Sequence, residues 1–234
     1  MKLSLLSKNK KASDVIEFTF KSDKVITWIP GQFLQYYIND NNPDNRGNDR
    51  YFTIVSAPFE KNILITTRFD IKHSSSFKDK LKSMNIGDTI EAEGPFGAFT
   101  LVAPSFDKHY VLIGGGIGIT PFRSILIDLD HNNDLSKMNI SLLYSNGNSE
   151  FVYKDFFDNL QIKNSNNFTV LYSTDRINQF SIKKIINNID NTIFYLSGSE
   201  GFVKYVKSLL KESLNIGGSN IKSDYFPGYN NIKY

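Results

Sequence analysis

The chain has 234 residues and contains no cysteine. This absence excludes disulfide bonds, zinc sites with thiolate ligands, cysteine nucleophiles and cysteine-ligated iron–sulfur clusters within this chain. The three histidines, His73, His109 and His131, are scattered without the spacing of metal ligands, so we predict no metal site. A G-x-S-x-G elbow is also missing, and with it the nucleophile of many hydrolases.

An excess of one charge and long hydrophobic runs are lacking too. The chain carries 27 Lys and Arg against 24 Asp and Glu, for a formal net charge of +3, and the two signs are interspersed. No basic block favours nucleic-acid binding. No apolar run approaches the ~20 residues of a membrane helix, and the N-terminus is too polar for a signal peptide. We therefore expect a cytoplasmic protein without an integral membrane segment or a nucleic-acid partner.

Residues 1–104 show short strand-like segments separated by turns rich in Gly, Pro, Asn and Asp. One short helical segment, residues 77–84, follows serines that are good N-caps. About six strands and one helix over such a length predict a closed antiparallel β-barrel. The predicted strands comprise residues 15–20, 32–38, 50–55, 63–68, 89–92 and 99–102.

After residue 104, strand-like and helical segments alternate. The predicted strands are residues 110–113, 140–144, 169–172, 193–196 and about 221–226. The predicted helices are residues 121–129, 151–160, 182–186 and 200–214. This alternation is typical of a doubly wound parallel sheet, so the fold class is β followed by α/β, with domains at 1–104 and 105–234.

A glycine cluster lies at the start of the second domain. Residues 114–118 read Gly-Gly-Gly-Ile-Gly, follow an apolar run and lead through Thr120 and Pro121 into a helix. Glycine permits close approach of another group, Pro fits the first helical turn, and a helix N-terminus binds phosphate. An alternative interpretation is a tight strand–helix turn without a ligand. Ligands of such sheets bind at the carboxyl ends of the strands, where Ser197-Gly198-Ser199 also lies.

The first domain offers a second candidate site. Arg50-Tyr51-Phe52-Thr53 places a cation, aromatic rings and a hydroxyl on one strand, a set that suits a planar cofactor with a pyrophosphate. The alternative is an exposed arginine beside two core aromatics. Residues 74–76, all serine, form either a phosphate site or a plain N-cap. Because no acid, base and nucleophile set is evident, a cofactor is expected to carry the chemistry.

Taken together, the motifs resemble those of the ferredoxin–NADP reductase-like flavoprotein reductases, in order and over nearly the whole chain. They are Arg50-Tyr51-Phe52-Thr53, Gly94-Pro95-Phe96-Gly97-Ala98-Phe99, Gly116-Ile117-Gly118-Ile119-Thr120-Pro121, Leu142-Leu143-Tyr144-Ser145 and Tyr195-Leu196-Ser197-Gly198. The resemblance implies an N-terminal FAD-binding β-barrel domain and a C-terminal NAD(P)-binding, Rossmann-like domain.

The resemblance also implies roles for individual residues. Arg50 would pair with flavin phosphate, Phe52 would pack on the isoalloxazine, and Thr53 would bond near its N5. The remaining expected flavin contacts are Tyr51, Thr67, Arg68, Ser74, Ser75 and Ser76. The expected nicotinamide-nucleotide contacts are Gly115, Gly116, Gly118, Thr120, Pro121, Ser173, Arg176 and Gly198. Thr53, Ser197 and Phe226 are the implied catalytic positions.

Three of these positions have open alternatives. Phe226 matches the family's C-terminal aromatic over the flavin, but it is otherwise a core aromatic, and Tyr229 or Tyr234 could substitute. Ser197 stands where the family commonly has cysteine, so hydride transfer is expected to be slower. Arg176 suits the 2′-phosphate of NADP, whereas the neighbouring Asp175 would repel it, and we lean slightly towards NADH.

The resemblance implies an NAD(P)H-dependent oxidoreductase that passes a hydride to FAD and then electrons to a ferredoxin, a flavodoxin or another redox partner. A free-flavin reductase and a regulatory or assembly module that retains the fold without turnover are the alternatives. A dehydrogenase without flavin is a weaker alternative, because it leaves the barrel unexplained.

Overall fold

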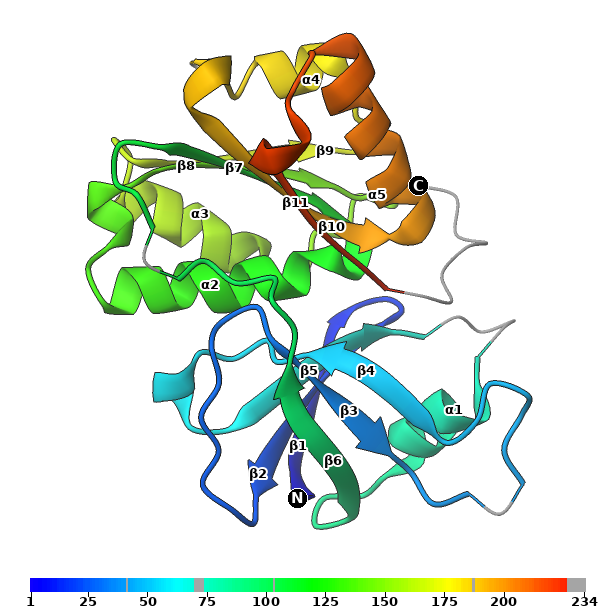
Figure 1. Cartoon of the computed structure of the whole chain (residues 1–234). Coiled ribbons are helices and arrows are strands. Elements are labelled where there is room, and N and C mark those ends of the chain that lie inside the picture. Colours follow the sequence, from blue (N-terminus) through cyan, green and yellow to red (C-terminus); the bar gives the residue numbers. More distant parts are fainter. Residues whose placement is uncertain (41, 70–73, 103, 187, 227–234) are drawn as a thin grey trace. The chain divides into compact units, whose positions relative to one another are not determined.

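The computed structural model describes residues 1–40, 42–69, 74–102, 104–186 and 188–226, which form two compact units (Figure 1). The first unit comprises Met1–Thr100 and the second Leu101–Tyr234. Each unit has its own sheet and its own hydrophobic core. The division after residue 104 stays a prediction of the sequence.

Within its described residues, the first unit forms a six-stranded antiparallel sheet with the order β4-β3-β6-β1-β2-β5. The two outer strands meet where the N–H of Val55, just beyond β4, donates to the carbonyl of Leu64 at 2.8 Å. The sheet therefore closes on itself, and the predicted antiparallel barrel is confirmed. Its strands are β1 (Lys2–Ala12), β2 (Val15–Ser22), β3 (Phe33–Tyr37), β4 (Asp49–Thr53), β5 (Ile63–Arg68) and β6 (Thr89–Phe96).

Two strand predictions in this unit are wrong. No strand is predicted before residue 15, whereas β1 begins at Lys2. Its first half buries Leu3 and Leu5, but its second half is rich in exposed lysines, which hides the alternation that marks a strand. Residues 99–102 form no strand, because β6 ends at Phe96 and Gly97 turns the backbone away with a φ of 99°.

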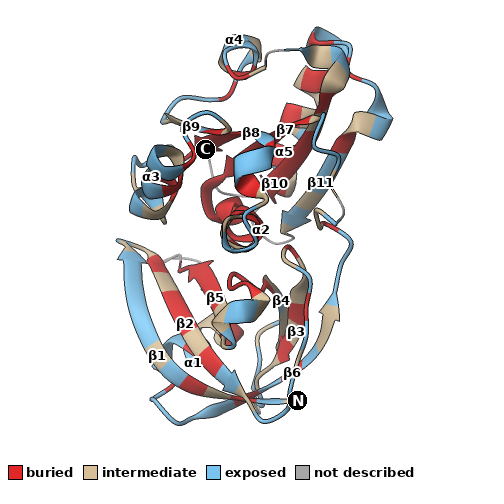
Figure 2. Cartoon of the chain, turned by 90° about the vertical axis from the view of Figure 1, so that its left-hand side faces the viewer, coloured by how far each residue is buried: buried red, intermediate tan, exposed pale blue. Residues whose placement is uncertain are grey.

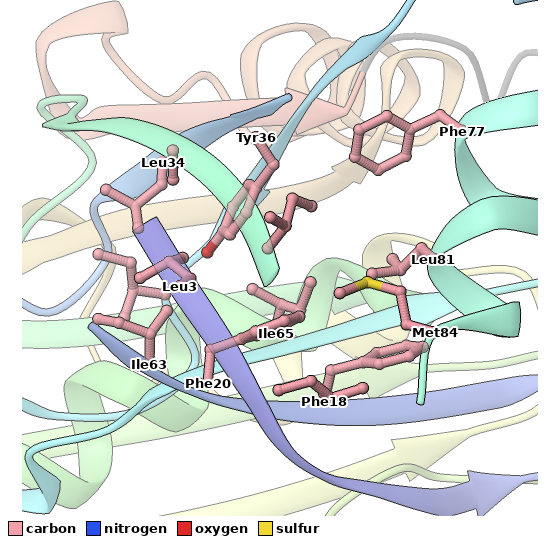
Figure 3. Packing of buried hydrophobic residues seen from close by; sticks show 14 of the residues in the cluster. Leu3, Phe18, Phe20, Leu34, Tyr36, Ile63, Ile65, Phe77, Leu81 and Met84 are labelled. Carbon is pink, nitrogen blue, oxygen red and sulfur yellow. The ribbon is translucent and has the colours of Figure 1, made fainter. Parts of the chain in front are cut away.

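Side chains from several strands and from α1 (Ser76–Ser83) fill one core (Figure 3). Ser75 caps the start of α1, because its Oγ accepts a hydrogen bond from the N–H of Lys78 at 3.2 Å. Phe77 and Leu81 lie one helical turn apart and are both buried. The labelled core residues are Leu3, Phe18, Phe20, Leu34, Tyr36, Ile63, Ile65, Phe77, Leu81 and Met84.

The hydroxyl of Tyr36 lies in this apolar core. Tyr36 is completely buried, and its hydroxyl has no hydrogen-bond partner among the described residues. Burial raises the pKa of this phenol well above its usual value, so the group stays neutral. A buried polar group without a partner costs about 1–3 kcal/mol.

Within its described residues, the second unit forms a five-stranded sheet with the order β11-β10-β7-β8-β9, in which neighbouring strands are parallel. The central strand β7 lies between β8 and β10, so the chain first winds outward on one side and then crosses to the other. The predicted doubly wound sheet is confirmed. The strands are β7 (His109–Gly115), β8 (Asn139–Ser145), β9 (Phe168–Ser173), β10 (Thr192–Ser199) and β11 (Ile221–Phe226).

Helices cover both faces of this sheet. The helices are α2 (Thr120–His131), α3 (Lys154–Lys163), α4 (Gln179–Lys183) and α5 (Glu200–Ser208). Leu143 on β8 shares a hydrophobic cluster with residues of α4 and α5, whereas the ring of Tyr144 lies 6.4 Å from that of Phe157 on α3. Since successive strand residues point to opposite faces, β7 and β8 are buried on both, as Figure 2 shows.

The helix bounds differ locally from the prediction. α3 begins at Lys154 rather than 151, because Tyr153 has a left-handed φ of 63° that a helix cannot include. α4 begins earlier than residue 182, because the Asn178 side chain accepts from the N–H groups of Phe180 and Ser181. α5 ends at Ser208 and continues as a wider π-helical turn over Leu209–Ser213.

The short 3₁₀ helix η2 (Gly116–Ile119) connects β7 to α2 and lies against the end of β10. A Cβ atom on Gly118 would lie 2.3 Å from the carbonyl oxygen of Ser197 and 2.5 Å from the Cα of Gly198. Backbone atoms cannot yield to such contacts, so only glycine permits this packing. The ring of Phe202 on α5 similarly takes the space of a Cβ at Gly115 (2.8 Å) and at Gly198 (2.7 Å).

We predict that Tyr36→Phe raises the free energy of unfolding by about 1 kcal/mol, because it removes a buried hydroxyl that has no partner. Tyr110→Phe is the matched control, since the Tyr110 hydroxyl accepts from the N–H of Ser105 at 2.8 Å and its loss should destabilise. Urea denaturation of the three proteins measures both changes. Destabilisation by Tyr36→Phe would show that the hydroxyl has a stabilising partner.

We predict that Gly118→Ala destabilises the protein by about 2 kcal/mol or more, because the new methyl group meets backbone atoms of β10. Gly201→Ala on α5 meets nothing within 4 Å and should stabilise by about 0.5 kcal/mol through helix propensity. Thermal unfolding followed by circular dichroism compares the two variants. Equal melting temperatures would contradict the close approach of η2 to β10.

Candidate functional site

The carboxyl edge of the parallel sheet carries the first group of predicted residues. Gly116 has a left-handed φ of 54°, and the start of α2 has no side-chain cap. The N–H of Thr120 donates to the carbonyl of Ile117, so α2 continues η2, and the N–H groups that need a partner such as a phosphate are those at the start of η2. Pro121 lies in the first turn of α2 and is buried, while the Thr120 hydroxyl donates to the carbonyl of Ile117 at 3.1 Å. The Thr120 hydroxyl is therefore used inside the protein.

The glycines of this edge have a packing role. Gly118 is required by the close contact with β10, and Gly115 and Gly198 are covered by the ring of Phe202. Sequence reasoning assigns these three residues to nucleotide binding and does not show the contact of Phe202 with two of them. The structure brings Gly118, Ser197 and Gly198 together, and their contact with a nucleotide stays a prediction.

Ser197 and Ser199 end β10 with different environments. The Ser199 Oγ accepts from the N–H of Phe202 at 3.2 Å and so caps α5. Ser197 is completely buried, and its Oγ has no hydrogen-bond partner among the described residues. An unsatisfied hydroxyl at the carboxyl end of a strand fits a site that receives a polar ligand group.

The end of β11 lies beside these serines. In the parallel ladder Asp224 pairs in register with Ser197, and Phe226 with Ser199. Phe226 is partly buried, and the alternatives Tyr229 and Tyr234 lie outside the described residues. Burial raises the pKa of the Asp224 carboxyl to about 6. Sequence reasoning misses Asp224; its one signal is a carboxylate two positions before the predicted terminal aromatic.

Ser173 and Arg176 lie near the end of β9, which is separated from β10 by β7 and β8 in the strand order. The Ser173 hydroxyl donates to the carbonyl of Asp175 at 3.1 Å. The guanidinium of Arg176 lies over the Tyr205 ring, 3.8 Å from its centroid, and the Tyr205 hydroxyl donates to the carbonyl of Ile177 at 2.9 Å. This loop is therefore held to α5.

In the first unit, successive residues of β4 point to opposite faces of the sheet. The guanidinium of Arg50 lies 5.4 Å from the ring centroid of Phe77, and the ring of Phe52 lies 6.0 Å from the same ring. Arg50 and Phe52 therefore share one face of β4. Thr53 is buried, whereas Tyr51 is 49% exposed and meets the ring of Phe33 edge-on at 5.7 Å.

The serines at the start of α1 lie next to this face, because α1 carries Phe77. The Ser75 Oγ caps the helix, and the N–H of Ser76 donates to the carboxylate of Asp44 at 2.9 Å. The Ser74 Oγ is buried and has no hydrogen-bond partner among the described residues. Two serines thus have structural partners, while the third offers a hydroxyl to a ligand.

Thr67 and Arg68 end β5, and both are buried. The Arg68 guanidinium forms an ion pair with Asp14, with the Nε 3.1 Å from the carboxylate, and the Arg68 carbonyl accepts from the Lys78 ammonium at 2.7 Å. Arg68 therefore already has a carboxylate partner. Its contact with a flavin stays a prediction.

Both units fit the groups that the sequence predicts. In the first unit, the buried Ser74 hydroxyl, the start of α1 and Arg50 on the Phe77 ring suit a phosphate. In the second, the start of η2, which has no side-chain cap, and the buried Ser197 hydroxyl suit a dinucleotide. Among the described residues, no three His, Asp or Glu side chains gather to hold a metal ion. No helix within them has the length and apolar character that crossing a membrane requires.

Known families match both units of the chain. Residues 2–101 match the oxidoreductase FAD-binding domain, and residues 112–208 match the oxidoreductase NAD-binding domain. The chain therefore contains an FAD-binding domain followed by an NAD-binding domain. The cofactors implied by the motifs, FAD and a nicotinamide nucleotide, are confirmed at this level.

Two curated relatives are similar in sequence. The plasma membrane-associated coenzyme Q6 reductase of Saccharomyces cerevisiae is 30% identical over 141 residues, which are 57% of this chain and 43% of that protein. NADH-cytochrome b5 reductase 2 of Lodderomyces elongisporus is 33% identical over 135 residues, 56% of this chain and 43% of that protein. The matched stretch thus spans less than half of either relative.

Two solved structures share the fold over nearly their whole length. The FAD/NAD-binding domain of nitric oxide dioxygenase from Vibrio cholerae has a TM-score of 0.79 at 20% identity, covering 96% of this chain and 98% of that chain. Ferredoxin–NADP⁺ reductase from Plasmodium falciparum has a TM-score of 0.80 at 17% identity, and the match covers 96% of this chain and 95% of that chain. With both domain families matched in order, the chain belongs to the FAD- and NAD-binding oxidoreductases of the ferredoxin–NADP reductase family.

Proposed function

We propose that this chain oxidises a reduced nicotinamide nucleotide, with FAD as the immediate hydride acceptor, and passes the electrons to a separate acceptor. The observation that carries the proposal is the combination of an FAD-binding domain (residues 2–101) and an NAD-binding domain (residues 112–208) in one chain. FAD, when bound, takes up a hydride and can release its electrons singly or together. The side chains of this protein would bind and orient the two nucleotides and exclude water from them.

In the first unit, Arg50 and the serines Ser74, Ser75 and Ser76 would hold the flavin phosphates. Phe52 would pack against the flavin ring, because it shares the face of β4 on which Arg50 lies. Thr53 would donate or accept a hydrogen bond at the flavin N5. Tyr51, Thr67 and Arg68 complete the proposed contacts.

In the second unit, the pyrophosphate would approach the start of η2 at Gly116, where backbone N–H groups can meet it, while Gly118 lets η2 lie against β10. Ser197 and Phe226 would contact the nicotinamide and the flavin ring. The unpartnered Ser197 hydroxyl supports this role, because a carboxamide offers it a hydrogen bond. Serine has no polarizable sulfur, so we expect the hydride step to be slower than with the cysteine that the family commonly has there.

The loop after β9 supports a preference for NADH. The guanidinium of Arg176 is stacked on the Tyr205 ring at 3.8 Å, and the neighbouring Asp175 is exposed. A 2′-phosphate near Asp175 would meet a like charge, whereas a 2′-hydroxyl would not.

The proposed acceptor is a separate redox protein, such as a ferredoxin, a flavodoxin or a haem protein. Without cysteine this chain cannot ligate an iron–sulfur cluster, so a one-electron centre of that kind must come from a partner. One relative is named a cytochrome b5 reductase and another a coenzyme Q6 reductase. Free flavin is an alternative acceptor.

A regulatory or assembly module is the second candidate function. The observation that favours it is Ser197, which is completely buried and departs from the family's cysteine. Such a module would keep the fold and the flavin without turnover.

We predict that anaerobic mixing of the FAD-loaded protein with NADH bleaches the flavin band near 450 nm, faster than mixing with NADPH does, because Asp175 disfavours a 2′-phosphate. Stopped-flow absorbance at equal nucleotide concentrations measures both rates. Faster bleaching by NADPH would overturn the cofactor preference. Stable FAD binding without bleaching by either nucleotide would favour the regulatory module, and failure to bind FAD would overturn both functions.

We predict that Asp224→Asn stabilises the protein near pH 7. The Asp224 carboxyl has a folded pKa of about 6, against about 3.9 when unfolded. Between these values the folded state binds more protons, so its stability falls as pH rises from about 4 to about 6. The variant should lose this slope and gain about 1–2 kcal/mol at pH 7, after a discount for partial exposure.

Melting temperatures across this pH range measure the slope, with exposed Asp190→Asn as the control. If Asp224 also holds a proton during turnover, the variant shifts the pH profile of flavin reduction, whereas the control does not. Parallel stability curves for wild type and Asp224→Asn would contradict the burial of an ionisable carboxyl at this position.

A further inference from the structure

The loop between β3 and β4 places a carboxylate at the start of α1. The Asp44 Oδ2 accepts from the N–H of Ser76 at 2.9 Å, and the N–H of Asp44 donates to the Ser76 Oγ at 3.0 Å. This reciprocal pair joins residues that are 32 positions apart in the sequence. The helix N-terminus that suits a phosphate therefore already binds an anion of the protein itself.

Arg46 completes this contact. Its Nη2 donates to the Asp44 Oδ2 at 2.8 Å and to the carbonyl of Ser74 at 2.7 Å. The Arg46 guanidinium and the Ser76 N–H hold the pKa of the Asp44 carboxyl well below its usual range, so it stays charged. A guanidinium, a helix N–H and a serine are also the groups that bind phosphate in proteins.

We propose that Asp44 is an internal competitor for the flavin phosphate, so that FAD binds by displacing its carboxylate from Ser76 and Arg46. This inference rests on the proposed FAD site at Ser74, Ser75 and Ser76. Two anions cannot share one N–H and one guanidinium without repulsion. When Asp44 leaves, Arg46 becomes the partner of the phosphate.

The Ser74 hydroxyl indicates that the site has hydrogen-bonding groups for a larger anion than a carboxylate. Its Oγ is buried without a partner among the described residues, although the Ser74 carbonyl is bonded by Arg46. A phosphate has three acceptor oxygens and can reach a helix N–H, a guanidinium and a hydroxyl together. Asp44 therefore fills the site incompletely and sets the affinity for FAD.

The competing explanation is that Asp44 only caps α1, since a carboxylate near a helix N-terminus is stabilising. The two explanations differ in what Asp44→Asn does to ligands with and without phosphate. If Asp44 is a competitor, its carboxylate weakens the binding only of flavins that carry a phosphate. A plain cap changes stability and leaves the ratio of flavin affinities unchanged.

The test uses the full chain freed of flavin and follows the quenching of flavin fluorescence during titration with FAD and with riboflavin, which has no phosphate. We expect Asp44→Asn to lower the Kd for FAD about tenfold, the loss of one like-charge contact, and to leave riboflavin unchanged. Asp40→Asn is the matched control. It removes the same charge from the same loop, where, within the described residues, the Asp40 side chain accepts only the N–H of Asn42, at 3.2 Å.

Several outcomes would overturn the proposal. A competing carboxylate is excluded if Asp44→Asn binds FAD as tightly as wild type or more weakly. It is also excluded if Asp44→Asn and Asp40→Asn gain the same affinity for FAD. If neither folded protein binds FAD, the proposed function fails instead.

The wild-type protein provides a second measurement in case Asp44→Asn does not fold. The rate of FAD binding should reach a plateau at high FAD concentration, because the carboxylate must leave first. A rate that stays linear with FAD concentration would contradict displacement.

Discussion

The second unit depends on one contact, the packing of the backbone of η2 against the end of β10. A Cβ at residue 118 would lie 2.3 Å from the Ser197 carbonyl oxygen, so glycine is required for the two segments to meet. The contact places the start of α2 beside Ser197, and the β10–β11 register adds Asp224. The ring of Phe202 extends the same constraint to Gly115 and Gly198. The glycine pattern is thus a packing requirement as well as a mark of nucleotide binding.

Buried hydroxyls without partners distinguish the candidate sites from the core. Ser74 and Ser197 each lie next to a helix or strand end where a polar ligand can supply the missing hydrogen bond, whereas Tyr36 lies among aliphatic and aromatic side chains. At Ser74 and Ser197 a bound ligand can therefore supply the missing hydrogen bond, whereas the apolar side chains around Tyr36 offer none. Asp44 shows a third solution, in which the protein supplies its own anion to a helix N-terminus.

Much of the fold could be predicted from the sequence, because its signals are local. The alternation of strands and helices predicts the parallel sheet, and a serine before Phe77 predicts the start of α1. Strand β1 could not be predicted, since its lysines mask the alternation of Leu3 and Leu5. The contact of Asp44 with Ser76 and the burial of Asp224 depend on tertiary structure, which local patterns do not encode. The packing of Phe202 on two glycines is likewise visible only in three dimensions.

A crystal structure of the protein with NAD⁺ bound tests the central claim most directly, which is that the glycine-permitted contact of η2 with β10 builds the dinucleotide site. The account predicts the pyrophosphate at the N–H groups that begin η2, with the nicotinamide amide within hydrogen-bond distance of the Ser197 Oγ. A dinucleotide bound away from η2, with the Ser197 hydroxyl still lacking a partner, would contradict it.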